Sequence, residues 1–193
     1  MVTLNSDLDI LAARGLLTAN LLAVHAVGLT PPAIEQFRSS GAGLVWCPSS
    51  NVFMLGRTAP GELLKSGVDV LLGSDSLLTG SANLLDELRF ARARAPLTDR
   101  DLEHAVGKTA AARLGLPAPA LEPGSRADLI LVTAPLLEAR AADVELVMVG
   151  GVPRVASSQL AGSFSGFAAK ARRKTVAGVT RWTVLSSLKT GNC

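Results

Sequence analysis

The chain has 193 residues, of which 48% are hydrophobic and 18% are charged, and its formal net charge is +3. This composition is typical of a soluble globular protein and excludes a disordered chain. The apolar runs are far shorter than the roughly 20 residues that a membrane-spanning helix needs, so we predict no transmembrane segment and no membrane partner.

The first part of the chain alternates apolar runs with helical patterns. Continuous apolar runs are typical of strands in a parallel sheet that is covered on both faces. The alternation therefore predicts a βαβαβ unit whose strands are parallel and adjacent in sequence order. The expected strands span about residues 21–25, 43–47 and 68–73.

The connections between these runs carry helix and turn signals. Thr30 followed by Pro31 predicts a helix that begins there and stops near Gly41. The string Pro48-Ser49-Ser50-Asn51 is typical of a turn. A second, short helix is expected at about residues 61–66.

Two longer helices are expected after the third strand. Asn83 can cap a helix over residues 84–94, with Asp86 three positions on. Thr98 and Asp101 have the same spacing at the start of a second helix. The expected apolar faces comprise Leu84, Leu85, Leu88 and Ala91 in the first helix, and Leu102, Ala105, Val106, Thr109, Ala110 and Leu114 in the second.

After residue 118 the pattern changes to short apolar runs separated by turns. Gly150-Gly151 lies between two such runs and predicts a hairpin, because both glycines can adopt positive φ. We therefore expect an α/β domain over residues 1–118, followed by a small antiparallel β module with a basic tail over residues 119–193. The expected strands are 128–132, 144–149 and 152–155, with a further hairpin or edge strand within 175–184.

Signals of targeting and of disulfide or nucleic-acid chemistry are weak. The first seven residues lack a basic stretch followed by an apolar segment, so no secretory signal is expected. The two cysteines, Cys47 and Cys193, form no disulfide framework and no zinc pattern, which favours a cytoplasmic location. The basic cluster at residues 170–174 lacks interleaved aromatic residues, so we interpret it as a solvated turn and expect no nucleic-acid partner.

Five strings stand in a distinctive order along the chain. They are Val24-His25-Ala26-Val27-Gly28-Leu29, Cys47-Pro48-Ser49-Ser50-Asn51, Leu72-Gly73-Ser74-Asp75-Ser76, Leu85-Asp86-Glu87-Leu88-Arg89 and Glu122-Pro123-Gly124-Ser125-Arg126-Ala127-Asp128-Leu129. Together they resemble the C-terminal half of the amidohydrolase superfamily, in particular its chlorohydrolase and cytosine, guanine or adenosine deaminase branch. The resemblance covers roughly residues 8–156. It implies that the three parallel strands are the sixth, seventh and eighth of a (β/α)8 barrel, and that the final strands belong to a small β-sandwich.

The length of the chain conflicts with a complete barrel. Eight βα units use on the order of 250 residues, yet only 74 residues precede Asp75. The family's His-x-His pair on the first strand and its His on the fifth, which hold the divalent metal, are not in this sequence. We therefore interpret the chain as a fragment, expected to retain no zinc or iron although the intact family member would bind one.

His25 and Asp75 are the candidate catalytic residues. By resemblance, Asp75 is a metal ligand that also accepts the proton of the attacking water, and His25 polarises the substrate. The structural alternatives are a turn or capping aspartate and a satisfied buried histidine. Trp46, Asn51 and Ser76 are the candidate substrate-binding residues, although the residues alone favour a core or pocket-wall role for Trp46 and a turn for Asn51.

Two classes of function follow. The first is a metal-dependent hydrolase of non-peptide carbon–nitrogen bonds, deaminase-like or chlorohydrolase-like, acting on a small nitrogen heterocycle. The second is a non-catalytic remnant, or a half-barrel that binds an N-terminal partner half or a second copy through an open strand edge. A His-x-His segment in the DNA upstream of Met1 would favour the first.

Overall fold

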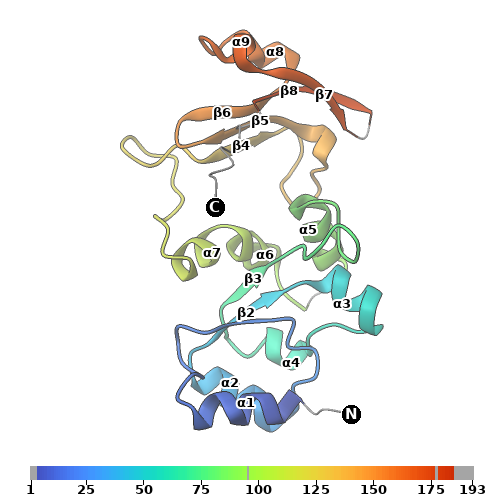
Figure 1. Cartoon of the computed structure of the whole chain (residues 1–193), viewed down its shortest axis with the longest axis vertical. Helices are drawn as coiled ribbons and strands as arrows, with labels where there is room; N and C mark the ends of the chain where they lie inside the picture. Colours follow the sequence, from blue (N-terminus) through green and yellow to red (C-terminus); the bar gives the residue numbers. More distant parts are fainter. Residues whose placement is uncertain (1–3, 95, 177, 185–193) are drawn as a thin grey trace, which may run out of the picture. The chain divides into compact units, whose positions relative to one another are not determined.

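The computed structural model describes residues 4–94, 96–176 and 178–184 (Figure 1). The chain forms two compact units, Met1–Ala118 and Pro119–Cys193. No helix in these described ranges is long and apolar enough to cross a membrane.

The first unit contains a three-stranded parallel sheet. Its strands are β1 (Leu22–Val24), β2 (Gly43–Trp46) and β3 (Val70–Leu72), in the order β1-β2-β3. The predicted parallel βαβαβ order is confirmed, although the strands are shorter than the apolar runs. No closed barrel is formed by the described residues, because β1 and β3 remain the two edges of the sheet.

Seven helices are described in this unit, and Figure 1 shows them beside the sheet. The core is built from side chains of β2 and of the helices, among them Phe37, Leu44, Trp46, Leu88 and Leu102, which are essentially fully buried. The helices are α1 (Leu4–Ala13), α2 (Pro31–Ser39), α3 (Pro48–Leu55), α4 (Gly61–Leu64), α5 (Leu84–Arg92), α6 (Asp99–Val106) and α7 (Lys108–Arg113).

The turn predicted at residues 48–51 is wrong, because these residues form the first turn of α3. Pro48 stands at the first helical position, where its missing N–H costs nothing. Gly56 closes the helix in the left-handed conformation, with φ of 67°. The side chains of Ser50 and Asn51 point inward and are 2% exposed, so tertiary contacts override their turn preference.

The predicted helix caps after β3 are confirmed, but the apolar faces are not continuous. Asn83 accepts a hydrogen bond from the Asp86 N–H, and Thr98 forms a capping box with Asp101. The second helix breaks at Gly107, whose backbone (φ −123°, ψ −100°) is not helical, and α7 begins after it. Leu114, which caps the carboxyl end of α7 beyond this break, is 57% exposed, although we expected it to be buried. Leu84, the first residue of α5, was also expected to be buried and is 40% exposed.

Arg113 of α7 ties together the segments that lead into the three strands. Its guanidinium donates to Asp69 Oδ2 at 2.7 Å, to the Ala19 carbonyl at 2.6 Å and to the Gly41 carbonyl at 2.8 Å. These acceptors lie shortly before β3, β1 and β2 respectively. Arg113 therefore fixes the amino ends of all three strands with one side chain.

The second unit is built on one five-stranded antiparallel sheet in the order β4-β5-β6-β8-β7. The predicted Gly150-Gly151 hairpin is confirmed, with φ of 57° and 77°. Phe167, Leu146 and Ala156 are in its small core. Its elements are β4 (Leu129–Val132), a 3-10 turn (Ala141–Asp143), β5 (Val144–Val149), β6 (Val152–Ala156), α8 (Ser158–Ala161), α9 (Phe167–Lys170), β7 (Arg172–Val176) and β8 (Val179–Thr183).

The basic cluster is not the turn that we predicted. Arg172, Arg173 and Lys174 lie in β7, which is an edge strand, and their side chains are exposed. Charged side chains on an edge strand oppose pairing with other chains, because pairing would bring the like charges together and desolvate them. The cluster thus has a structural reason that requires no nucleic acid.

Candidate active site

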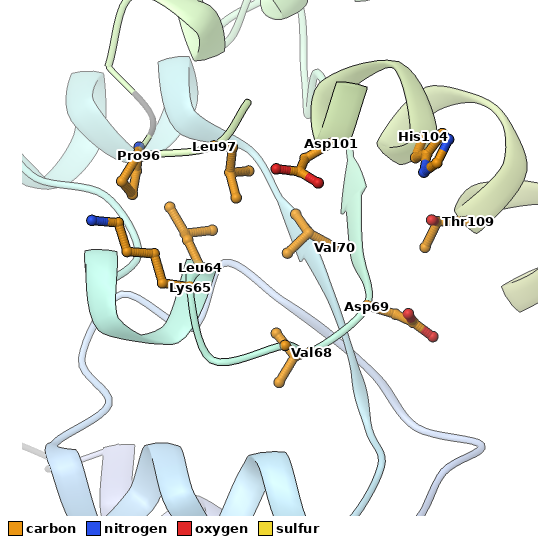
Figure 2. Close-up of a pocket in the computed structure, with 11 residues that line it drawn as sticks. Leu64, Lys65, Val68, Asp69, Val70, Pro96, Leu97, Asp101, His104 and Thr109 are labelled. Carbon is orange, nitrogen blue, oxygen red and sulfur yellow. The ribbon is translucent and has the colours of Figure 1, made fainter. Parts of the chain in front are cut away.

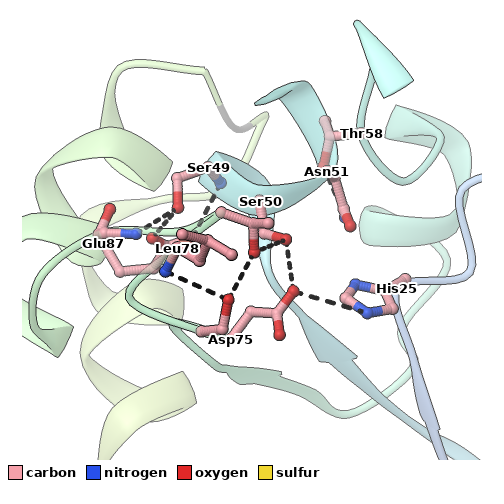
Figure 3. A network of polar contacts seen from close by, with 11 residues as sticks. His25, Ser49, Ser50, Asn51, Thr58, Asp75, Leu78 and Glu87 are labelled. Carbon is pink, nitrogen blue, oxygen red and sulfur yellow. Dashed lines mark hydrogen bonds and ion pairs between the residues drawn. The ribbon is translucent and has the colours of Figure 1, made fainter. Parts of the chain in front are cut away.

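His25 and Asp75 meet at the carboxyl end of the parallel sheet. His25 follows β1 directly, and Asp75 lies three residues after the end of β3. The distance from His25 Nε2 to Asp75 Oδ2 is 4.0 Å, and the two side chains are 41% and 34% exposed (Figure 3). Both residues therefore lie on one rim of the sheet, open to solvent. Their catalytic roles stay predictions.

The backbone at both residues has an unusual conformation. His25, Ala26 and Asp75 have φ of 73°, 47° and 56°, and they are the non-glycine residues with positive φ in the described ranges. Such a conformation costs on the order of 1–3 kcal/mol and persists only where the surroundings enforce it. The His25 N–H donates to the Val45 carbonyl at 3.0 Å, which holds the first of these sites.

A chain of hydroxyl groups leads to the Asp75 carboxylate. The Oγ of Ser50, from the first turn of α3, donates to Asp75 Oδ2. The same Oγ lies 3.2 Å from Thr79 Oγ1, which in turn lies 2.9 Å from Ser76 Oγ. Figure 3 shows these contacts as a chain that ends at Asp75, with Ser50 as the hydroxyl that contacts the carboxylate.

A buried carboxylate fixes the same part of α3 from the other side. Glu87 of α5 has no exposed surface and accepts two hydrogen bonds from Ser49, one from its N–H at 2.9 Å and one from its Oγ. The N–H of Ser81 donates to Ser49 Oγ at 2.9 Å. Glu87 and Ser49 were not predicted as site residues. A signal existed, because a charged residue on the buried face of α5 needs polar partners.

Two of the three predicted substrate-binding residues, Trp46 and Asn51, are buried together around Thr58 and do not line the exposed rim. Trp46 has no exposed surface and donates from Nε1 to Thr58 Oγ1 at 2.6 Å, so it is a core residue in this structure. Asn51 is 2% exposed and donates to the same Thr58 oxygen at 3.3 Å. Only Ser76 of the three is exposed beside Asp75. Substrate contacts by Trp46 and Asn51 stay predictions, and they would require both side chains to become accessible.

Cys47, directly after β2, is buried, and its thiol is expected to be unreactive. Burial raises the pKa of its thiol from 9.0 to about 11. The charges of Asp75 and Glu87 add to the rise, and a hydrogen bond from the Asp75 backbone N–H opposes it. A thiol in this environment stays protonated near neutral pH and is a poor nucleophile.

The residues present do not complete a divalent-metal site. No group of three or more His, Cys, Asp and Glu side chains in the described ranges is arranged to hold a metal ion. His25 and Asp75 supply two neighbouring groups, and one buried nitrogen of His25, Nδ1, has no hydrogen-bond partner within those ranges. A catalytic zinc usually has three protein ligands. The pair therefore fits only a part of such a site.

A pocket of about 400 Å³ lies at the opposite end of β3 (Figure 2). It is lined by Val68, Asp69 and Val70 before and within β3, and by Asp101 and His104 of α6. The amino end of parallel strands in barrel proteins serves stability and the carboxyl end serves chemistry. The two acidic residues of the pocket already bind Arg113 and Thr98. We therefore place the candidate site at His25 and Asp75.

Comparison with known proteins decides the family. The family model described as "Amidohydrolase family" matches residues 4–154, which is most of the chain. The chain belongs to the amidohydrolase family. Among its curated relatives, the 5-methylthioadenosine/S-adenosylhomocysteine deaminase of Pyrococcus abyssi is 29% identical over 179 residues, covering 80% of this chain and 42% of the relative. The aminodeoxyfutalosine deaminase of Deinococcus radiodurans is 36% identical over 87 residues, covering 44% of this chain and 21% of the relative.

Solved structures of amidohydrolases match the fold. An adenosine deaminase from Xanthomonas campestris with bound zinc superposes with a TM-score of 0.65 at 25% identity, covering 76% of this chain and 39% of that protein. The zinc complex of atrazine chlorohydrolase from Arthrobacter aurescens TC1 gives 0.61 at 25% identity, covering 75% and 38%. The chain thus spans less than half the length of the relatives that it matches.

Proposed function

We propose that this chain supplies the carboxyl-terminal part of a metal-dependent deaminase, with β1, β2 and β3 as the last three strands of a (β/α)8 barrel. The observation that carries the proposal is the pairing of His25 with Asp75 at the carboxyl rim of the sheet, at 4.0 Å. Active sites of parallel barrels lie at this rim. The parallel order of the three strands and the names of the relatives support it.

Each of the two residues has a role in the proposed reaction, in which water adds to the ring carbon that carries an amino group and ammonia leaves. Asp75 accepts the proton of the attacking water, since a carboxylate next to the reacting atom is a competent general base. His25 donates a hydrogen bond to the substrate where negative charge develops. Ser76, exposed beside Asp75, is the proposed substrate contact.

The metal of the intact enzyme is proposed to be zinc or iron, with Asp75 as one of its ligands. Solved neighbours that contain zinc include the adenosine deaminase and the atrazine chlorohydrolase. The remaining ligands are expected from histidines that this sequence does not contain, since its two histidines are His25 and His104.

The proposed substrate is a small molecule with an amino group on a nitrogen heterocycle. The relatives are named as deaminases of 5-methylthioadenosine or S-adenosylhomocysteine, of aminodeoxyfutalosine and of adenosine. A chlorohydrolase of atrazine is among the structural neighbours, so a displacement of chloride on a triazine is the related alternative.

A second proposal is that the chain binds a partner as a complementing half. The observation that favours it is the open sheet, in which β1 and β3 each have a neighbour on one side only. An unpaired parallel edge is a template for another strand, and Val24 on β1 is 53% exposed. The partner would be an N-terminal half-barrel or a second copy of this chain.

A fused protein tests the first proposal. The chain is joined behind the part of the Pyrococcus abyssi deaminase that it does not match and is supplied with zinc. The fusion is assayed for ammonia release from 5′-methylthioadenosine and adenosine, and for chloride release from atrazine. We expect turnover of an aminopurine nucleoside. A folded, zinc-loaded fusion that turns over none of the three would contradict the deaminase proposal, whereas binding of the separate halves without turnover would favour the second.

A further inference from the structure

We infer that Ser50 is a positioning residue that orients the carboxylate of Asp75. The hydrogen bond between Ser50 and Asp75 is seen in the structure, whereas its role in catalysis rests on the function proposed above. Ser50 lies on α3, and Asp75 lies 25 residues later in the loop after β3. The contact therefore connects two separate segments at the rim of the sheet.

The hydrogen bond takes one of the two carboxylate oxygens and leaves the other for chemistry. Ser50 Oγ donates to Oδ2, the same oxygen that faces His25 Nε2 at 4.0 Å. Oδ1 has no hydrogen-bond partner among the described residues. The Ser50 contact thus fixes which oxygen of Asp75 remains available for a metal or a proton.

Burial makes this contact specific. Ser50 is 2% exposed, so its hydroxyl cannot readily exchange Asp75 for bulk water. Its other neighbour, Thr79 Oγ1 at 3.2 Å, is uncharged and therefore a weaker acceptor than the carboxylate. Asp75, by contrast, is 34% exposed at its side chain and sits on a loop. An aspartate in that position would sample several rotamers if nothing held it.

The helix that carries Ser50 is itself held in place. The neighbouring Ser49 is bound to the buried Glu87 of α5, and the Ser81 N–H donates to Ser49 Oγ. The loop after β3 is therefore attached twice to the first turn of α3, through Ser50 and through Ser49. Two attachments on adjacent residues define both the position and the orientation of the loop.

Gly80 allows the loop after β3 to fold tightly enough for these contacts. A Cβ atom on Gly80 would lie 2.0 Å from the backbone oxygen of Ser74, which no real contact tolerates. The Gly80 N–H also donates to the Ser76 carbonyl at 2.8 Å. The loop thus folds back on itself directly around Asp75, and this closure lets Thr79 reach Ser50.

The test is an NMR measurement of the Asp75 side chain in the isotopically labelled 193-residue chain. The two couplings between Hα and the Hβ protons of Asp75 report whether one rotamer is populated. We expect the limiting couplings of one rotamer in the wild type, intermediate couplings averaged over several rotamers in Ser50→Ala, and a return to the limiting couplings in Ser50→Thr. Ser66→Ala is the matched control, because Ser66 is another part-buried serine of the same unit whose Oγ donates to a carbonyl.

Single-rotamer couplings retained in a folded Ser50→Ala variant would overturn the inference. If that variant does not fold, Ser50→Cys replaces it, because a thiol of similar size is a much weaker donor. Couplings identical to the wild type in Ser50→Cys would overturn the inference equally.

Activity of the fused protein supplies a second readout. Ser50→Ala is expected to lower kcat by about tenfold with KM unchanged, because about one hydrogen bond to a reacting group is lost. A rise in KM with kcat unchanged, which would indicate weaker substrate binding, would contradict a positioning role. The NMR result does not depend on turnover, so an inactive fusion would refute the deaminase proposal and leave the Ser50 inference testable.

Discussion

Removing the Arg113 side chain is expected to loosen the amino ends of all three parallel strands at once. The guanidinium is 18% exposed and makes three hydrogen bonds, to the carbonyls of Ala19 and Gly41 and to the carboxylate of Asp69. In Arg113→Ala each acceptor must find water or remain unpaired. The loss falls on the segments that set the register of β1, β2 and β3.

The magnitude follows from the exposure of each acceptor. A hydrogen bond from a charged donor contributes about 1.5 kcal/mol when partly shielded, as at Gly41, and about 1 kcal/mol at the more exposed Ala19. Asp69 is 52% exposed, so its ion pair adds about 0.5 kcal/mol. The expected loss is about 3 kcal/mol for Arg113→Ala. Arg113→Lys keeps the charge but not the fork of donors, so about half should return.

Urea unfolding followed by Trp46 fluorescence measures this loss. The chain has two tryptophans, Trp46 and Trp182, so a Trp182→Phe background leaves the buried Trp46 as the reporter of the first unit. With a slope of about 2 kcal/mol per molar urea, the midpoint should fall by about 1.5 M. Arg38→Ala, which removes an exposed ion pair on α2, is the control. Equal midpoints for the Arg113→Ala and Arg38→Ala variants would refute the reasoning.

Three further predictions concern the site and its loop. Burial raises the Cys47 pKa in the folded chain, so the stability that Cys47 contributes is present below about pH 9 and lost as pH rises toward about 11. In a Cys193→Ser background, the free energy of unfolding should fall less steeply between about pH 9 and about pH 11 when Cys47 is changed to Ala. An unchanged slope would contradict the burial argument. Gly80→Ala should lower the free energy of unfolding in urea by about 2 kcal/mol or more, because the new Cβ would meet the backbone oxygen of Ser74. Gly61→Ala, whose Cβ would have its nearest contact at 3.7 Å, should leave the free energy of unfolding unchanged. Equal effects of the two variants would refute the close approach at Gly80. Elemental analysis of the purified 193-residue chain should find much less than one divalent metal per chain, because two neighbouring groups do not make a zinc site. An ammonia assay of the same chain should find no deamination. One tightly bound metal per chain would show that the site is complete.

The sheet and the helix caps were predictable because their signals are local. Continuous apolar runs specify buried parallel strands, and the pairs Asn83 with Asp86 and Thr98 with Asp101 specify helix starts by spacing alone. His25 and Asp75 followed from the same logic, since a residue directly after a parallel strand must emerge at the carboxyl rim. Their catalytic roles came from the family resemblance and not from spacing.

The network around Asp75 was not predictable, because it depends on contacts between distant segments. Residues 48–51 have the composition of a turn, and only the burial of Ser50 and Asn51 against the rest of the unit makes them helical. Glu87 finds Ser49 across 38 residues of sequence, which no local pattern specifies. The break at Gly107 was likewise hidden, since the helical periodicity continues through it.

The most direct test of the proposed function is ammonia release from 5′-methylthioadenosine by the fused, zinc-loaded protein with and without the Asp75 carboxylate. The proposal predicts turnover by the fusion, loss of turnover to background in Asp75→Asn, and an unchanged kcat in Asp69→Asn, which alters a carboxylate near the other end of the same strand. Turnover that survives Asp75→Asn would contradict the assignment of this rim of the sheet as the active site.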